Sequence, residues 1–112
     1  MSERRWTLEA ARALLPDVRA RTSRAVAEAE TLTEEQALHE PGSEPHRQLA
    51  ERIEAAVMRW SREMEALGLE TKGLWLVDFD SGSGCYCWQW PEERLDFYHG
   101  YDEGFAGRGR IH

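Results

Sequence analysis

The last third of the chain contains six candidate side chains for metal binding, proton transfer or charge pairing. They are Asp78, Cys87, His99, Asp102, Glu103 and Arg108. An imidazole and several carboxylates close together can bind a divalent metal, and the same groups can act as an acid/base pair. These six residues are therefore the candidate functional site.

The imidazole and carboxylate groups suggest one particular arrangement. His99, Asp102 and Glu103 occur within a short turn-like stretch, and Asp78 precedes them in a separate strand-like run. If Asp78 folds against the others, the four make a nitrogen and oxygen site for a divalent metal, with Asp78, His99 and Asp102 as ligands. No metal-ligand spacing of the H-x-x-x-H or C-x-x-C type is present, so metal and acid/base chemistry stay open as alternatives.

Each of these residues also has a structural interpretation. Asp78 stands between two apolar residues, so a buried carboxylate there needs a partner. His99 follows apolar neighbours at the two-residue spacing of a strand, which is typical of a hydrogen-bonded core histidine. We predict that Phe105 anchors the tail in the core and that Arg108 pairs with Asp78, because guanidinium can make two parallel hydrogen bonds to a carboxylate.

Two cysteines, Cys85 and Cys87, lie two residues apart in a strand-like run. Their Cα atoms are then about 6.6 Å apart on one face of the strand. This separation is near the upper limit for a disulfide, so we predict two free thiols, as expected in a reducing compartment. A nucleophilic Cys87 activated by His99 is a further alternative, which requires both side chains on one face of adjacent strands.

The first part of the chain is patterned as helices. Thr7 is a typical N-cap, and Pro16 predicts the end of a short helix and the start of a long one over residues 16–38. After a break at residues 41–43, apolar residues recur with helical spacing and include Trp60, which we expect in the core. Gly68 is suited to end this helix in a left-handed conformation. Two long helices joined by a short loop predict an antiparallel hairpin.

After Gly68 the apolar period changes to two, which is typical of β-strands. The predicted strands cover residues 74–79, 85–90 and 95–99. The fold class is therefore α+β, with a short N-terminal helix, a long antiparallel helical hairpin and a C-terminal three-stranded antiparallel meander. We predict a single domain over residues 1–112, in which residues 1–68 are helical and residues 69–112 form the meander and an irregular tail.

Composition excludes some classes of partner. The chain has 14 basic and 21 acidic side chains, a formal net charge of −7, so nucleic acid is not an expected partner. No segment approaches the roughly 18 to 20 apolar residues needed to span a bilayer, and the N-terminus does not resemble a signal peptide. We expect a cytoplasmic protein that does not bind membranes.

Several motifs carry a resemblance to a known family. They are Trp6-Thr7-Leu8-Glu9-Ala10, Leu14-Leu15-Pro16, Gly73-Leu74, Val77-Asp78-Phe79, Cys87-Trp88, Tyr98-His99 and Gly104-Phe105-Ala106-Gly107-Arg108. In these residues the chain resembles a small bacterial family catalogued as domain of unknown function 2203. The resemblance implies a single domain and no particular activity.

Two functions follow as alternatives. The first is a non-enzymatic interaction or assembly module, most simply a homodimer. The predicted meander would expose aromatic residues that one helical hairpin cannot cover on both faces, and two-fold contacts are the commonest assemblies. The aromatic residues are Trp75, Tyr86, Trp88 and Trp90. The second is a metal-dependent or acid/base site on Asp78, His99, Asp102 and Glu103, for which a divalent metal is the one cofactor suggested.

Overall fold

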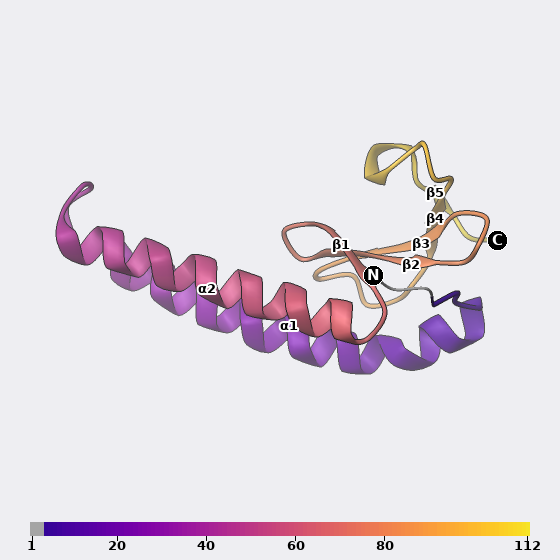
Figure 1. The fold of residues 1–112 in the computed structure, drawn as a ribbon, viewed down its shortest axis with the longest axis horizontal. Coiled ribbons are helices and arrows are strands. Elements are labelled where there is room, and N and C mark those ends of the chain that lie inside the picture. Colours follow the sequence, from indigo (N-terminus) through magenta and orange to yellow (C-terminus); the bar gives the residue numbers. More distant parts are fainter. Residues whose placement is uncertain (1–3) are drawn as a thin grey trace.

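Two long helices are followed by a five-stranded antiparallel sheet in the computed structural model, which describes residues 4–112 (Figure 1). The helices are α1 (Leu8–Gln36) and α2 (Glu44–Ala66). The strands are β1 (Glu70–Gly73), β2 (Leu76–Asp80), β3 (Cys85–Gln89), β4 (Phe97–His99) and β5 (Gly109–Arg110), with a short 3-10 helix, η1 (Phe105–Gly107), before β5. The α+β class is confirmed. The predicted three strands correspond to β2, β3 and β4, and β1 and β5 are additional edge strands.

Helix α1 differs from the prediction at Pro16. Thr7 caps the helix as predicted, because its Oγ1 accepts a hydrogen bond from the backbone N–H of Ala10 at 3.0 Å. The predicted short first helix is wrong, however, since α1 runs without interruption through Pro16. Leu15 before the proline and Val18 after it are both buried in the core. Their packing offsets the roughly 3 kcal/mol that an internal proline costs a helix.

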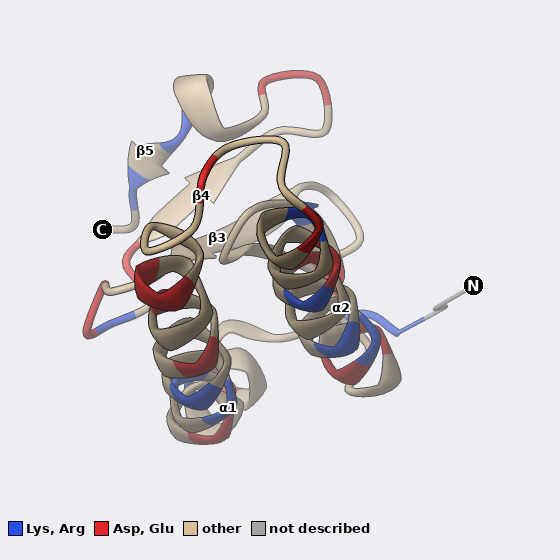
Figure 2. Cartoon of the chain, turned by 90° about the vertical axis from the view of Figure 1, so that its left-hand side faces the viewer, with Lys and Arg blue, Asp and Glu red and all other residues tan. Residues whose placement is uncertain are grey.

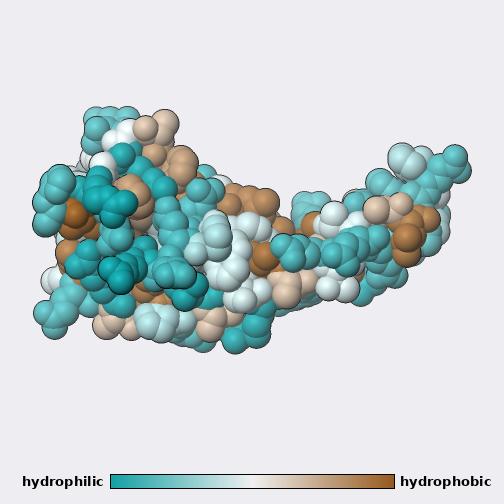
Figure 3. Space-filling model, turned by 180° about the vertical axis from the view of Figure 1, so that it is seen from behind, coloured by the Kyte–Doolittle hydropathy of each residue, from teal (hydrophilic) through white to brown (hydrophobic). Residues whose placement is uncertain are grey.

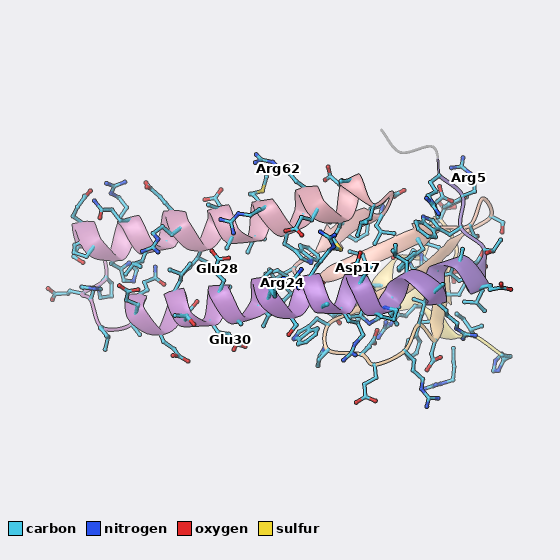
Figure 4. The ribbon with its side chains drawn as sticks, turned by 90° about the horizontal axis from the view of Figure 1, so that it is seen from below. Arg5, Asp17, Arg24, Glu28, Glu30 and Arg62 are labelled. Atoms are coloured by element: carbon cyan, nitrogen blue, oxygen red, sulfur yellow. The ribbon has the colours of Figure 1, made fainter. Side chains whose placement is uncertain are left out.

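The helices form the predicted antiparallel hairpin and lie side by side along their length (Figures 1 and 4). Ser43 caps α2, and Gly68 after it has a φ of +93°. Between the helices, the indole Nε1 of the buried Trp60 donates a hydrogen bond to Thr22 Oγ1 at 2.8 Å. On the outside, Glu28 of α1 pairs with Arg59 of α2 at 2.9 Å.

One face of the sheet packs on the helices and carries the apolar core. Val77 and Phe79 of β2 and Trp88 of β3 are buried there, and three further aromatic residues in or beside the strands pack against the core. These three are Trp75, Tyr86 and Trp90. The aromatic face that motivated the dimer prediction is therefore turned toward the helices. The apolar areas on the surface shown in Figure 3 are separate from one another, and the dimer stays a prediction.

Two of the predicted strands begin later than expected. Leu74 and Trp75 connect β1 to β2 and do not belong to a strand, and Trp75 has a φ of +59°. Leu95 lies before β4 and is buried in the core on the helix side. Leu95 and residue 96 lie outside β4, so the strand alternation that would place Leu95 and His99 on one face does not apply. His99 lies on the face opposite to Leu95.

Basic and acidic residues are interspersed along both helices, as the blue and red segments of Figure 2 show. No helix among residues 4–112 combines the length and the apolar character needed to cross a membrane.

Candidate functional site

The face of the sheet turned away from the helices carries the candidate site. Asp78 of β2 pairs directly with Cys87 of β3, and His99 of β4 pairs with Cys85. Because paired residues share a face and alternate residues return to it, these side chains all project from the same side. Asp78, Cys87 and His99 have relative exposures of 2%, 1% and 4%. Residues 100–110 fold over this face, as the yellow segment in Figure 1 shows.

His99 is held by hydrogen-bonding groups at both ring nitrogens. Nδ1 lies 2.7 Å from the carbonyl oxygen of Gly100, and Nε2 lies 3.0 Å from Asp78 Oδ2. A carbonyl only accepts hydrogen bonds, so Nδ1 carries a hydrogen. An ionised carboxylate also only accepts, so a proton or a metal ion must lie between Nε2 and Oδ2.

The protonation of His99 follows from these contacts. Burial lowers the pKa of His99, but the hydrogen bonds to Gly100 and Asp78 and the negative charges of Asp78 and Glu103 outweigh it, so the pKa is raised above its usual value. In the absence of a metal ion, these contacts favour the protonated form of His99. With both nitrogens engaged, His99 has none left to act as a base toward a substrate.

Asp78 has one unsatisfied oxygen. Its Oδ1 is buried and accepts no hydrogen bond from any residue that the structure describes. A buried polar atom without a partner costs roughly 1 to 3 kcal/mol, more for a charged group, and such atoms frequently mark the position of an ion or a water. This oxygen is therefore free to accept a further hydrogen bond or to bind an ion.

Cys87 lies beside the pair as a protonated thiol. Burial and the negative charge of Asp78 raise its pKa to about 12, and Arg108 opposes this shift. Burial likewise raises the pKa of Cys85 to about 12. A thiol in this state is a poor nucleophile, and His99 has no free nitrogen to activate it. The arrangement therefore does not support the Cys87–His99 nucleophile alternative.

Arg108 reaches the site from the C-terminal segment, but not as predicted. Its guanidinium makes two hydrogen bonds to the carboxylate of Glu92, at 3.1 Å and 2.5 Å, and does not pair with Asp78. Its Nη1 also lies 4.0 Å from Cys87 Sγ. Asp78 is instead neutralised by His99. Glu92, in the turn before β4, carries no pattern by which the sequence could single it out.

The remaining tail residues lie outside the buried cluster. Asp102 and Glu103 are exposed, although Glu103 accepts a hydrogen bond from the backbone N–H of Gly100 at 2.6 Å. Glu103 thus fixes the turn whose carbonyl orients His99. Phe105 was predicted to anchor the tail in the core, but it is 41% exposed and covers the guanidinium of Arg108 at 4.3 Å.

Three potential metal ligands thus meet on this face. Among the described residues, one oxygen of Asp78, Sγ of Cys87 and one nitrogen of His99 all lie within 4.8 Å of one another. Zinc bound at about 2.0 to 2.3 Å in tetrahedral geometry would hold such atoms roughly 3.4 to 3.6 Å apart. His99 Nε2 and Asp78 Oδ2, at 3.0 Å, are closer than this spacing, so an ion between them would require the two side chains to move apart.

Comparison with known proteins identifies the family. Residues 4–111 match the family described as "Uncharacterized conserved protein (DUF2203)". The chain belongs to this family. The match covers nearly all of the sequence and confirms the resemblance found in its motifs. No curated protein and no solved structure matches the chain. The family description names no ligand, so the function of this DUF2203 protein is inferred from its site.

Proposed function

We propose that the protein binds a zinc ion through Asp78, Cys87 and His99. The observation that carries the proposal is the buried, unsatisfied Asp78 Oδ1 in a cluster with a thiol and an imidazole. A set of one oxygen, one sulfur and one nitrogen ligand favours zinc, because magnesium and calcium prefer oxygen ligands only.

The orientation of His99 supports this choice. A histidine that binds a metal through one nitrogen commonly donates its other N–H to a backbone carbonyl or a carboxylate, which fixes the ring and its tautomer. The Nδ1 of His99 faces the Gly100 carbonyl at 2.7 Å, which leaves Nε2 directed toward Asp78 and the proposed ion.

Charge balance supports it as well. Without metal, the carboxylate of Asp78 faces a protonated His99, so the buried pair is neutral. With zinc, the imidazole and the Cys87 thiol each lose a proton, and one carboxylate and one thiolate neutralise the doubly charged ion. The site therefore exchanges two protons for one metal ion without a net charge in the protein interior, where an unpaired charge is costly.

Three protein ligands leave a fourth position on zinc. No other His, Cys, Asp or Glu among residues 4–112 joins this group. Zinc sites closed by four protein ligands are structural, whereas three protein ligands and one open position are typical of catalytic sites. We therefore propose that the fourth position takes water or a small exogenous ligand.

Metal analysis of the tag-free protein tests the proposal. We expect about one zinc per chain after purification, and zinc titration of the chelator-treated protein should show one binding site. Asp78→Asn keeps the side-chain volume and should weaken zinc binding by more than about tenfold, since a first ligand matters at least as much as the groups that orient it. Asp102→Asn changes an exposed carboxylate in the following turn and is the matched control. Wild-type protein that neither retains nor binds zinc would disprove the proposal.

A further inference from the structure

The contacts of Arg108 are unusually well defined for a residue in a surface segment. Both terminal nitrogens bind Glu92, and the guanidinium carbon lies 3.9 Å from the ring centre of Phe97 and 4.3 Å from that of Phe105. The side chain is only 15% exposed. Two hydrogen bonds and two aromatic rings thus fix the plane of the guanidinium.

This fixed plane directs Nη1 at the proposed zinc ligand. Nη1 lies 3.1 Å from Glu92 Oε1 and 4.0 Å from Cys87 Sγ. We propose that Arg108 is a positioning residue that donates an N–H to the Cys87 sulfur and stabilises it as the thiolate ligand of the metal. This inference rests on the proposed zinc function and assigns a role to a residue outside the ligand set.

The chemistry of the bond explains why an arginine suits this place. When Cys87 binds zinc, its S–H bond is lost and the sulfur becomes an anion that needs hydrogen-bond donors in a buried setting. A guanidinium keeps its charge at every relevant pH and carries several N–H groups in one plane. It can therefore hold Glu92 and still present an N–H to the sulfur.

The fold explains how a residue of the tail reaches the site. Strand β5 pairs with β4 through Tyr98 with Gly109 and Phe97 with Arg110. Phe97 also pairs with Cys87 across β3 and β4, so Arg110 is level with the cysteine. Arg108 lies two residues before Arg110, and its side chain crosses the ring of Phe97 to reach Cys87. The two-residue strand β5 thus positions a donor over the site.

Three variants test the role of Arg108. Arg108→Gln removes the charge, Arg108→Lys keeps it, and Arg110→Gln is the matched control. Arg110 lies two residues further on, with its guanidinium carbon 5.2 Å from the ring centre of the same Phe97, and it pairs with Asp96 at 3.6 Å, away from the ligand set. Zinc affinity and the sulfur-to-metal charge-transfer band of the cobalt-substituted protein are measured for each.

We expect Arg108→Gln to weaken zinc binding by roughly 10- to 100-fold, the range found when groups that orient metal ligands are removed. The charge-transfer band should move to longer wavelength, because a sulfur that loses a hydrogen-bond donor gives up its electron more easily. Arg108→Lys should recover part of the affinity, and Arg110→Gln should resemble the wild type. A change in packing alone would not move the band.

The controls separate this inference from the zinc proposal. If wild-type protein binds no metal, both fail. If it binds zinc and Arg108→Gln matches Arg110→Gln in affinity and band position, only the role of Arg108 is disproved. Circular dichroism checks the folding of each variant. If Arg108→Gln does not fold, Glu92→Gln replaces it. Glu92→Gln weakens the hydrogen bonds that hold the Arg108 guanidinium, so it should shift the charge-transfer band in the same direction. An unchanged band would then disprove the role of Arg108.

Discussion

Replacement of Asp78 in metal-free protein should show how strongly the buried pair depends on its carboxylate. Asp78→Ala leaves the imidazolium of His99 buried beside a cavity, and removal of one partner from a buried ion pair typically costs about 3 to 5 kcal/mol. Asp78→Asn keeps the volume, and its amide N–H can donate to the Nε2 of a neutral His99. One hydrogen bond then replaces another, so the cost should be about 1 to 2 kcal/mol.

These values are a large share of the total stability, because small domains have unfolding free energies of about 5 to 15 kcal/mol. Urea unfolding in the presence of a chelator, followed by tryptophan fluorescence, measures each variant against wild type. We expect Asp78→Ala to be at least about 2 kcal/mol less stable than Asp78→Asn. A difference below about 0.5 kcal/mol would refute the reasoning, since the carboxylate would then not be paired in solution.

The same variants predict a pH dependence. Because the folded pKa of His99 is raised, folding takes up a proton above the unfolded pKa of about 6.5. The stabilisation by the pair is fully present below that pH and is lost as pH rises through the folded pKa, by at most about 1.4 kcal/mol per pH unit. The interval from pH 6 to pH 8 isolates this effect, because the cysteine thiols of the unfolded chain ionise only near pH 8.5. Asp78→Asn should largely remove the decline, and an unchanged slope would contradict the assignment of the proton to His99.

Further predictions concern the metal, the thiols, the core and assembly. Zinc affinity should rise between pH 6 and pH 8, opposite to metal-free stability, because His99 and Cys87 must each release a proton to bind. Isothermal titration at several pH values measures this rise. Cys87→Ser should bind zinc at least about tenfold more weakly than Cys85→Ser, because both thiols are buried but only Cys87 belongs to the ligand group. Competition with a zinc indicator measures the two affinities. Trp60→Ala should cost about 3 to 5 kcal/mol in urea unfolding, and a loss below about 1 kcal/mol would show that the indole is not buried. Light scattering should give a dimer mass, and a monomer at high micromolar concentration would exclude the dimer.

The helical hairpin could be predicted from sequence because its signals act locally. A cap such as Thr7 and a left-handed terminator such as Gly68 depend on neighbours within one turn, and both occupy the predicted positions. Pro16 is the exception. Its local effect is to break a helix, but Leu15 and Val18 pack against residues far away in sequence, and that packing prevails.

The edge strands and the contacts of the site could not be predicted in the same way. Glu70–Gly73 lacks apolar alternation and Gly109–Arg110 has only two residues, so their hydrogen-bonding partners define them as strands. The meeting of Asp78 with His99 depends on the register of three strands, and a shift of one residue would turn a side chain to the other face. Arg108 forms its ion pair with Glu92 and not with Asp78 because of the position at which the tail crosses the sheet.

The two faces of the sheet differ in a way that favours a binding role for the outer one. Toward the helices, the strands bury apolar and aromatic side chains, whereas Asp78, Cys87 and His99 are buried to the same degree under a tail of largely exposed residues. Apolar residues of similar volume at these positions would often stabilise a fold as much or more, because charged groups lose hydration when they are buried. In a chain of this size such a loss is a substantial part of the total stability. Zinc binding would offset it, because an ion that binds only the folded chain stabilises that chain in proportion to its affinity and concentration. The buried polar cluster therefore supports the proposed zinc site more than it supports a purely structural second core.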